Sequence, residues 1–222
     1  MGAWETEPRP SSRSLRSCSS CKLSGWRCAF RAAQLVALAC LVACGMVAEE
    51  SRYSPSYKRS EWSHWRDFDG DCQNTRQEVL IASSTRSVSF ASGSGCRVVA
   101  GEWMDPYSGK VFTESRLLDI DHVVALKDAF SSGGYLWTRE QKKVFANDPA
   151  NLIAVSASEN RSKGSKGPDE WLPSNGEYRC EYISKWVAVK QSYGLSMTAC
   201  ESSVVNYMMR VCEAGMVPPR PK

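Results

Sequence analysis

Two carboxylates and an imidazole interrupt an apolar stretch of this sequence between residues 117 and 124. Asp119, Asp121 and His122 stand there among leucine, isoleucine and valine, in the order LLDIDHVV. Burying such groups among aliphatic side chains costs several kcal/mol unless each is paired or holds a metal. An imidazole titrates near neutral pH and carboxylate oxygens suit hard cations, so the cluster predicts acid–base or metal chemistry.

The spacing of this cluster sets a condition on the strand that carries it. Asp119 and Asp121 are two residues apart, so in a regular strand they share a face, while the adjacent His122 points to the other face. The strand must therefore end or distort at His122 if both residues serve one phosphate. Asp119 is either a second metal ligand or a structural acceptor.

Turn and capping signals predict the elements around the cluster. Residues 86–118 favour strands, and DPYSGK at 105–110 joins two of them as a hairpin. NLIAVS at 151–156 is a further strand, and Ser156 with Glu159 forms a capping box that starts the next helix. Other helices are predicted over 125–130, 177–192 and 199–212.

Three stretches, DIDHVVAL, NDPANLIAVS and ASENRSKGSKGPDEWLP, give the order strand, connection, strand and helix. This order resembles the HNH (His-Me finger) endonucleases, whose site is a ββα-metal module. It is also similar to the nuclease-type domain at the C-terminus of GmrSD restriction enzymes. The resemblance implies an α+β fold with a ββα-metal core at about residues 117–166, an N-terminal strand-rich half and C-terminal helices.

The resemblance also implies roles for individual residues. His122 corresponds to the general base, Asp121 and Asn160 to metal ligands, and Asn151 to the asparagine that orients the loop holding the base. The family often has a histidine where this chain has Asn160. The whole chain contains two histidines, which excludes a zinc site built on several of them, and oxygen donors favour Mg²⁺ or Mn²⁺.

Basic residues follow Asn160 on the same predicted helix. Arg161, Lys163 and Lys166 are expected to contact phosphates beside the metal, although such a run is also typical of a solvated helix face. Arg76 is a candidate for one more phosphate contact. Contacts to phosphate carry no sequence information, so cleavage of DNA without sequence preference is predicted, with RNA as a further substrate.

A second acidic constellation lies in DFDGDCQNTRQE. Its residues Asp67, Asp69, Asp71 and Glu78 fall at positions 1, 3, 5 and 12 of an EF-hand-like loop. Position 6, where that loop has glycine for its sharp turn, is Cys72. The two interpretations are a structural Ca²⁺ site and an acidic cap before a helix.

Residues 1–48 have the pattern of an export signal, with arginines and a lysine before an uncharged apolar stretch that ends at Glu49. LVAC at 41–44 also resembles a bacterial lipobox, in which Cys44 would carry a lipid anchor to the membrane. This segment holds six of the 28 Lys+Arg and two of the 24 Asp+Glu, which leaves 22 of each for residues 49–222. We expect those residues to form one formally neutral domain, so that nucleic acid is attracted only by local basic patches.

The cysteines of the exported part predict disulfide bonds, because export leads to an oxidising compartment. Cys72–Cys96 and Cys180–Cys212 are the expected pairs, with Cys200 left odd, although spacing alone does not fix the connectivity.

The sequence thus predicts an exported, metal-dependent endonuclease that hydrolyses phosphodiester bonds. The alternative is a non-catalytic surface protein that binds DNA for uptake or adhesion, which would keep the basic helix but would not need His122. A structural lipoprotein with a calcium-stiffened loop is the third interpretation.

Overall fold

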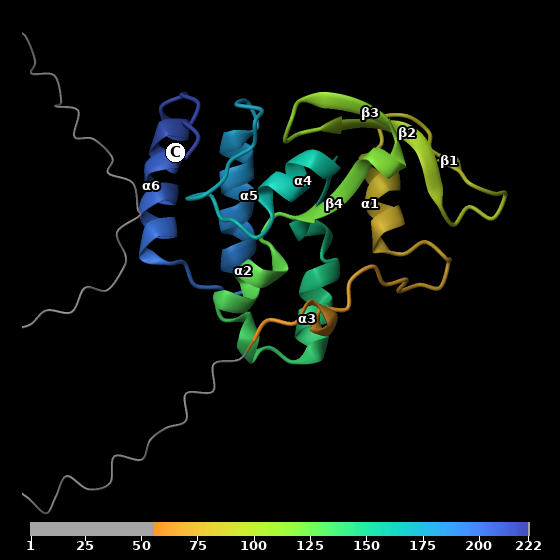
Figure 1. Ribbon diagram of the computed structural model, residues 1–222, viewed down its shortest axis with the longest axis horizontal. Coiled ribbons are helices and arrows are strands. Elements are labelled where there is room, and N and C mark those ends of the chain that lie inside the picture. Colours follow the sequence, from red (N-terminus) through yellow and green to blue (C-terminus); the bar gives the residue numbers. More distant parts are fainter. Residues whose placement is uncertain (1–55, 222) are drawn as a thin grey trace, which may run out of the picture. The chain divides into compact units, whose positions relative to one another are not determined.

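The computed structural model describes residues 56–221, which form two small antiparallel sheets and several helices, with the sheet of β1, β2 and β3 at one edge (Figure 1). The predicted export signal at 1–48 and its lipobox lie outside the described residues. The strands are β1 (Ser89–Phe90), β2 (Val98–Asp105), β3 (Lys110–Glu114), β4 (Leu118–His122) and β5 (Leu152–Ser156). The α-helices are α1 (Thr75–Ser83), α2 (Leu126–Ser131), α3 (Arg139–Asn147), α4 (Ala157–Lys163), α5 (Arg179–Ser192) and α6 (Ala199–Glu213). Short 3₁₀ turns are η1 (Arg59–Glu61), η2 (Ser115–Leu117), η3 (Gly134–Leu136) and η4 (Pro149–Asn151).

The predicted DPYSGK turn is present between β2 and β3. Asp105 ends β2, and its carboxylate accepts hydrogen bonds from the Tyr107 backbone N–H at 2.9 Å and from the Ser108 hydroxyl at 2.6 Å. Gly109 has φ = 71°, a left-handed conformation that glycine adopts without steric cost. The turn directs Tyr107 inward, where its side chain is fully buried.

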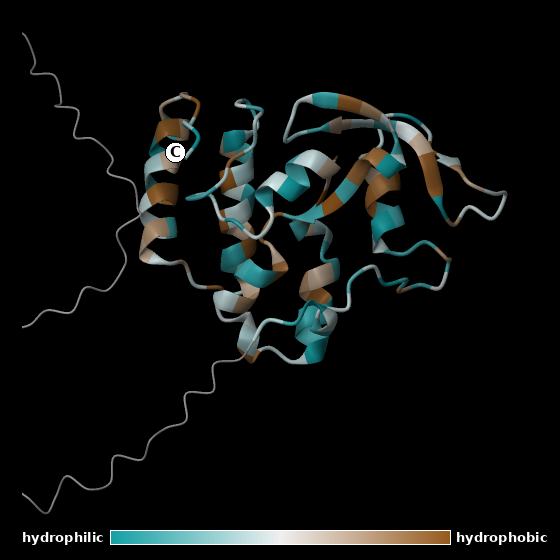
Figure 2. Ribbon diagram, viewed as in Figure 1, coloured by the Kyte–Doolittle hydropathy of each residue, from teal (hydrophilic) through white to brown (hydrophobic). Residues whose placement is uncertain are grey.

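The second sheet is the pair β4–β5, and its antiparallel register is unbroken from one end of β4 to the other. Alternate residues of a strand face opposite sides, so Leu118 and Ile120 pack with Leu80 of α1 in one apolar cluster. Val155 of β5 points the other way and belongs to the larger core. Figure 2 shows the hydrophobic residues of α1 and β4 at this position.

The segment between β4 and β5 is helical. The helix predicted over 125–130 is confirmed as α2, whereas α3 was not predicted. Thr138 and Gln141 form a capping box that begins α3, and Phe145 of this helix is fully buried in the larger core. The segment between β4 and β5 therefore packs α3 into the larger core, beside these two strands.

The two C-terminal helices confirm the prediction for residues 177–212. α5 and α6 pack against each other, with Trp186 of α5 fully buried. Both predicted disulfides, Cys72–Cys96 and Cys180–Cys212, are present. Cys200, expected to be the odd cysteine, is disulfide-bonded as well.

Residues 56–221 include no helix that is long and apolar enough to cross a membrane. The fold of this part of the chain is α+β, as the sequence predicted.

Candidate active site

His122 is the last residue of β4, and its imidazole has one fixed hydrogen-bond partner. Nε2 lies 2.8 Å from the carbonyl oxygen of Ala146, the residue before the end of α3. A carbonyl only accepts hydrogen bonds, so Nε2 carries the proton and the lone pair of the neutral ring is on Nδ1. Burial lowers the pKa of His122 to about 3, because a charged imidazolium loses its hydration there. The ring is therefore neutral at physiological pH and can accept a proton at Nδ1.

Asn151 holds the chain that follows His122. Its side-chain oxygen accepts the N–H of Val124 at 2.8 Å, and its amide nitrogen donates to the carbonyl of the same residue at 3.2 Å. The backbone carbonyl of Asn151 also accepts the N–H of Val123 at 2.8 Å. Asn151 is fully buried, and these three bonds support the role expected of it, that of orienting the loop beside the base.

A strap of four residues, 63–66, covers the other side of the His122 ring. The Trp65 ring lies 5.8 Å from the imidazole at 32°, and the His64 ring lies 6.4 Å away at 81°. Asn147 holds both ends of this strap. Its side-chain nitrogen donates to the carbonyl of Ser63 at 2.7 Å, and its side-chain oxygen accepts the N–H of Arg66 at 3.0 Å. Both ends of the His64–Trp65 segment are thus tied to the end of α3.

Trp65 has φ = 59°, a left-handed conformation that costs a bulky residue energy and is common at functional sites. Nδ1 of His64 donates to the Trp62 carbonyl at 2.9 Å, since a carbonyl can only accept. The sequence carried no signal that His64 and Trp65 meet His122, because the contact spans more than fifty residues. They are the site residues that sequence reasoning missed.

The opposite face of β4 carries Asp119 and Asp121, and α4 lies across it. The Ser156 side chain caps α4 by accepting the N–H of Glu159 at 3.4 Å, which is one half of the predicted capping box. The other half is absent, because the Glu159 carboxylate accepts the Ser174 hydroxyl at 2.7 Å. Asn160 of α4 donates to Asp119 Oδ2 at 3.0 Å, and both side chains are half-buried. Among the described residues no hydrogen bond engages Asn160 Oδ1 or Asp119 Oδ1, so two hard oxygen donors remain available to a cation.

Asp121 is occupied by other partners. Its Oδ2 accepts a hydrogen bond from the Tyr107 hydroxyl at 2.8 Å, and its Oδ1 accepts one from Lys163 Nζ at 3.1 Å. In the same ion pair Nζ lies 2.9 Å from Oδ2. The same ammonium donates to the carbonyl of His122 at 2.8 Å. Burial raises the pKa of Asp121, and the ion pair with Lys163 opposes this effect.

The prediction that Lys163 contacts phosphate is wrong. Its side chain is 0% exposed and its ammonium faces β4. The spacing contained a signal: residues three apart share a helix face, so Lys163 must face the same way as Asn160. Asp119 and Asp121 share a strand face in the same manner, and the two pairs match across the contact.

β4 ends at His122, so the first of the two conditions set by the sequence, an end or a distortion of the strand, is met. His122 pairs with Leu152 as the last residue of the register, and the side chains of Asp121 and His122 leave the strand on opposite faces. Among the residues described, the structure brings Asp119, Asn160, Asp121 and Lys163 together on one face and places His122 on the other.

The remaining basic candidates differ in exposure. Arg161 and Lys166 are exposed, and Lys166 Nζ donates to the Ser162 carbonyl at 2.9 Å. Lys166 was predicted on the same helix as Asn160, but α4 ends at Lys163 with Gly164 as its C-cap. Arg76 is half-buried, and its guanidinium donates to the carbonyl of Leu118 at 2.9 Å, near Asp119. Arg76 thus holds the start of β4 as well as lying beside the candidate metal oxygens.

The acidic loop before α1 gathers the side chains of Asp67, Asp69 and Asp71, whose carboxylate oxygens lie within 4.8 Å of one another. Asp67 accepts the backbone N–H of Gly70 at 2.7 Å and of Cys72 at 3.0 Å. Cys72, at the position where an EF-hand has glycine, has φ = 73°. Burial, followed by the charge of Asp69, raises the pKa of Glu78 on α1. Calcium binding by Asp67, Asp69, Asp71 and Glu78 stays a prediction.

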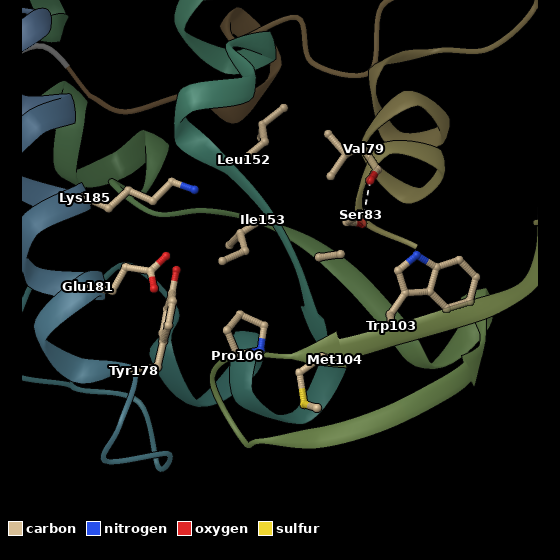
Figure 3. Close-up of a pocket in the computed structure, with 11 residues that line it drawn as sticks. Val79, Ser83, Trp103, Met104, Pro106, Leu152, Ile153, Tyr178, Glu181 and Lys185 are labelled. Atoms are coloured by element: carbon tan, nitrogen blue, oxygen red, sulfur yellow. Dashed lines mark hydrogen bonds between the residues drawn. The ribbon is translucent and has the colours of Figure 1, made fainter. Parts of the chain in front are cut away.

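A hollow of the described residues lies away from this cluster. It has a volume of about 430 Å³ and lies between α1, β2, β5 and α5, with Ile153 and Lys185 among the residues that line it (Figure 3). None of the candidate catalytic or metal-binding side chains lines it. Its size therefore carries no evidence about the chemistry at His122.

Comparison with known proteins adds to this geometry. A family model described as GmrSD restriction endonucleases, C-terminal domain, matches residues 74–203. A protein of Arthroderma benhamiae described as "Uncharacterized secreted protein" is 37% identical over 170 residues, which cover 76% of this chain and 81% of that protein. No solved structure matches the chain. With more than half of its length matched, the chain belongs to the family of GmrSD restriction endonuclease C-terminal domains.

Proposed function

We propose that this protein is an exported endonuclease that hydrolyses phosphodiester bonds in DNA by HNH-type chemistry, without sequence preference. The observation that carries the proposal is the neutral His122 imidazole at the end of β4, whose Nδ1 lone pair is set by the bond from Nε2 to Ala146. Membership of the restriction endonuclease family supports the same activity.

In this mechanism Nδ1 of His122 takes a proton from a water molecule as its oxygen attacks the phosphorus. A new P–O bond forms, the P–O bond to the leaving oxygen breaks, and that oxygen departs with the electron pair and is protonated by solvent. The imidazolium that results keeps its Nε2–H bond to the Ala146 carbonyl, which stabilises the positive charge. A nearby phosphate anion raises the pKa of His122 and so strengthens the base when substrate is bound.

Divalent metal is usual for restriction-endonuclease-like domains, and the donors here fit one in part. Asp119 and Asn160 would hold Mg²⁺ or Mn²⁺, because each has a hard, half-buried oxygen that no hydrogen bond from residues 56–221 engages. A bound cation supplies charge neutralisation on the phosphate. Asp121, predicted to be a ligand, is already paired with Lys163 and Tyr107 and fits less well.

Exposed Arg161 and Lys166 would hold the nucleic-acid backbone beside Asn160. Within the part of the chain that the structure describes, neither side chain forms a salt bridge, so both charges are available to a phosphate. Such contacts do not read bases, which is why cleavage without sequence preference, of DNA and also of RNA, is proposed.

The secreted relative and the disulfides support export of the chain, and they agree with the signal proposed at 1–48. A lipid anchor at Cys44 is part of this proposal.

The test is cleavage of supercoiled plasmid by the disulfide-bonded protein with Mg²⁺ or Mn²⁺, with and without EDTA. His122→Ala should reduce cleavage by about a hundredfold or more, since a general base contributes on that order. His64→Ala is the comparison, because it removes the other imidazole of the site and keeps the proposed base, so it should reduce cleavage far less than His122→Ala does. If wild type and His122→Ala bind DNA equally well and neither cleaves it, the alternative of a non-catalytic surface DNA-binding protein is favoured instead.

A further inference from the structure

We propose that Lys163 is the resident cation of Asp121 and a positioning residue for His122, and that Asp121 is not a ligand of the divalent metal. The positioning role rests on the proposed function, because it requires His122 to act as the general base. Its claim about metal binding can be measured without any cleavage.

The first observation is the enclosure of the Lys163 ammonium. Nζ donates hydrogen bonds to Asp121 Oδ1 at 3.1 Å and to the carbonyl of His122 at 2.8 Å, and it lies 2.9 Å from Asp121 Oδ2 in the same ion pair. Lys163 is 0% exposed and Asp121 is 5% exposed. The buried ammonium therefore faces Asp121 and the end of β4, and neither solvent nor a phosphate reaches it.

The second observation is the closure of the carboxylate from its other side. The buried Tyr107 hydroxyl donates to Asp121 Oδ2, and its ring packs edge-on against Trp171 and Tyr182. A tyrosine held by its ring presents the hydroxyl in one place. Asp121 is thus enclosed by Lys163 and Tyr107, which come from different parts of the chain.

Replacing the ammonium by a metal ion would be unfavourable in this setting. A cation that entered at Asp121 would leave the Lys163 charge buried without a partner, or would require the last turn of α4 to release it. The charge balance at Asp121 is already complete with one ammonium. The position that motif comparison assigns to a metal is therefore occupied by the chain itself.

The third observation concerns what the pair holds in place. Lys163 bonds the backbone carbonyl of His122, the residue whose ring carries the proposed base. Asn151 fixes the backbone immediately after His122, and Ala146 fixes the ring. Lys163 completes this set by joining α4 to the end of β4, so it acts on the reaction through His122.

A pair of variants separates the two roles of Asp121. The double variant Asp121→Asn with Lys163→Met removes both buried charges while keeping similar shapes, and Asp119→Asn changes the proposed metal carboxylate. Mn²⁺ binding is measured by titration calorimetry on the disulfide-bonded protein. We expect the double variant to bind Mn²⁺ nearly as wild type does, and Asp119→Asn to bind about tenfold more weakly or worse.

The positioning role has its own measurement. In the double variant kcat should fall about ten- to a hundredfold with KM little changed, because the base is displaced while the phosphate contacts remain. The matched control is Lys142→Met with Glu61→Gln, which removes another lysine–carboxylate pair, 2.8 Å apart with the lysine buried. It should leave both Mn²⁺ affinity and kcat unchanged.

Loss of Mn²⁺ binding in the double variant, with binding kept in Asp119→Asn, would overturn the inference and make Asp121 the ligand. If the double variant does not fold, Tyr107→Phe decides, since it removes one hydrogen bond from Asp121 and keeps the packed ring. Unchanged Mn²⁺ affinity in Tyr107→Phe supports the inference, and a clear change contradicts it. Absence of cleavage by wild type would refute the proposed function while leaving the Mn²⁺ result intact.

Discussion

At the scale of single residues, hydrogen bonds to backbone carbonyls and amides decide what the polar side chains can do. Ala146 fixes the tautomer of His122, and Asn151 fixes the loop that follows it. Asp121, to which the family resemblance assigns a metal, differs through its partners from Asp119, for which the sequence left two roles open. A buried ion pair engages Asp121, whereas Asp119 keeps one oxygen that no hydrogen bond within residues 56–221 engages.

The low pKa of His122 makes a prediction about stability. Its folded pKa of about 3 lies below its ordinary value of 6.5, so the unfolded chain takes up the proton first as the pH falls. The stability that this residue contributes is complete above pH 6.5 and is lost progressively towards pH 3. Between pH 6.5 and 4.5 the loss should be roughly 2–3 kcal/mol.

Urea unfolding across this pH range measures the effect in wild type and in His122→Gln, which does not titrate. The variant should show a smaller loss of stability on acidification than wild type does. Identical pH dependence in wild type and His122→Gln would show that burial does not suppress protonation of this imidazole.

At the scale of elements, the two faces of α4 have different surroundings. Asn160 and Lys163 are three residues apart and both face β4, while Arg161 of the same helix is exposed. The helical period, 3.6 residues per turn, is the physical reason for this difference. Lys166 is also exposed, but it lies beyond the end of α4 at Lys163.

The exposure of Arg161 and Lys166 predicts a salt effect on DNA binding. The double variant Arg161→Ala with Lys166→Ala should bind every DNA sequence more weakly to a similar degree. The slope of log K against log [salt] should decrease by about 0.9 for each phosphate that the variant no longer binds. Affinity measured by fluorescence anisotropy at several salt concentrations gives both quantities. Arg210→Ala on α6, also exposed, is the control, and an equal change in both proteins would contradict a specific role for Arg161 and Lys166.

At the scale of the whole described part, residues 56–221, two apolar clusters meet along β4 and β5. Two disulfide bonds cross-link segments outside this pair of strands. The larger cluster includes buried residues of α2, α3, α5 and α6, whereas the smaller one joins α1 and β2 to β4 and β5. Cys72–Cys96 closes the acidic loop against the region before β2, and Cys180–Cys212 joins α5 to α6.

Removal of the Cys180–Cys212 bond should lower stability more than it lowers activity. The bond closes a segment with a sequence separation of 32, and the chain-entropy model assigns about 3–4 kcal/mol to a loop of that length. Thermal unfolding of Cys180→Ser with Cys212→Ser measures the loss. Plasmid cleavage well below the new Tm should stay close to wild type, because neither cysteine contacts His122. A loss of cleavage in fully folded protein would instead tie α6 to the site.

The sequence by itself determined those features that depend on near neighbours. The DPYSGK hairpin, the Ser156 cap and the two C-terminal helices follow from turn residues, capping side chains and apolar period, and all are present. The tertiary structure alone decided the features that join distant segments. Trp65 reaches His122, Tyr107 reaches Asp121, and α3 supplies the carbonyl that orients the imidazole. Local propensity contains no information about such pairs, since their energy arises only when packing has brought the segments together and removed water from between them.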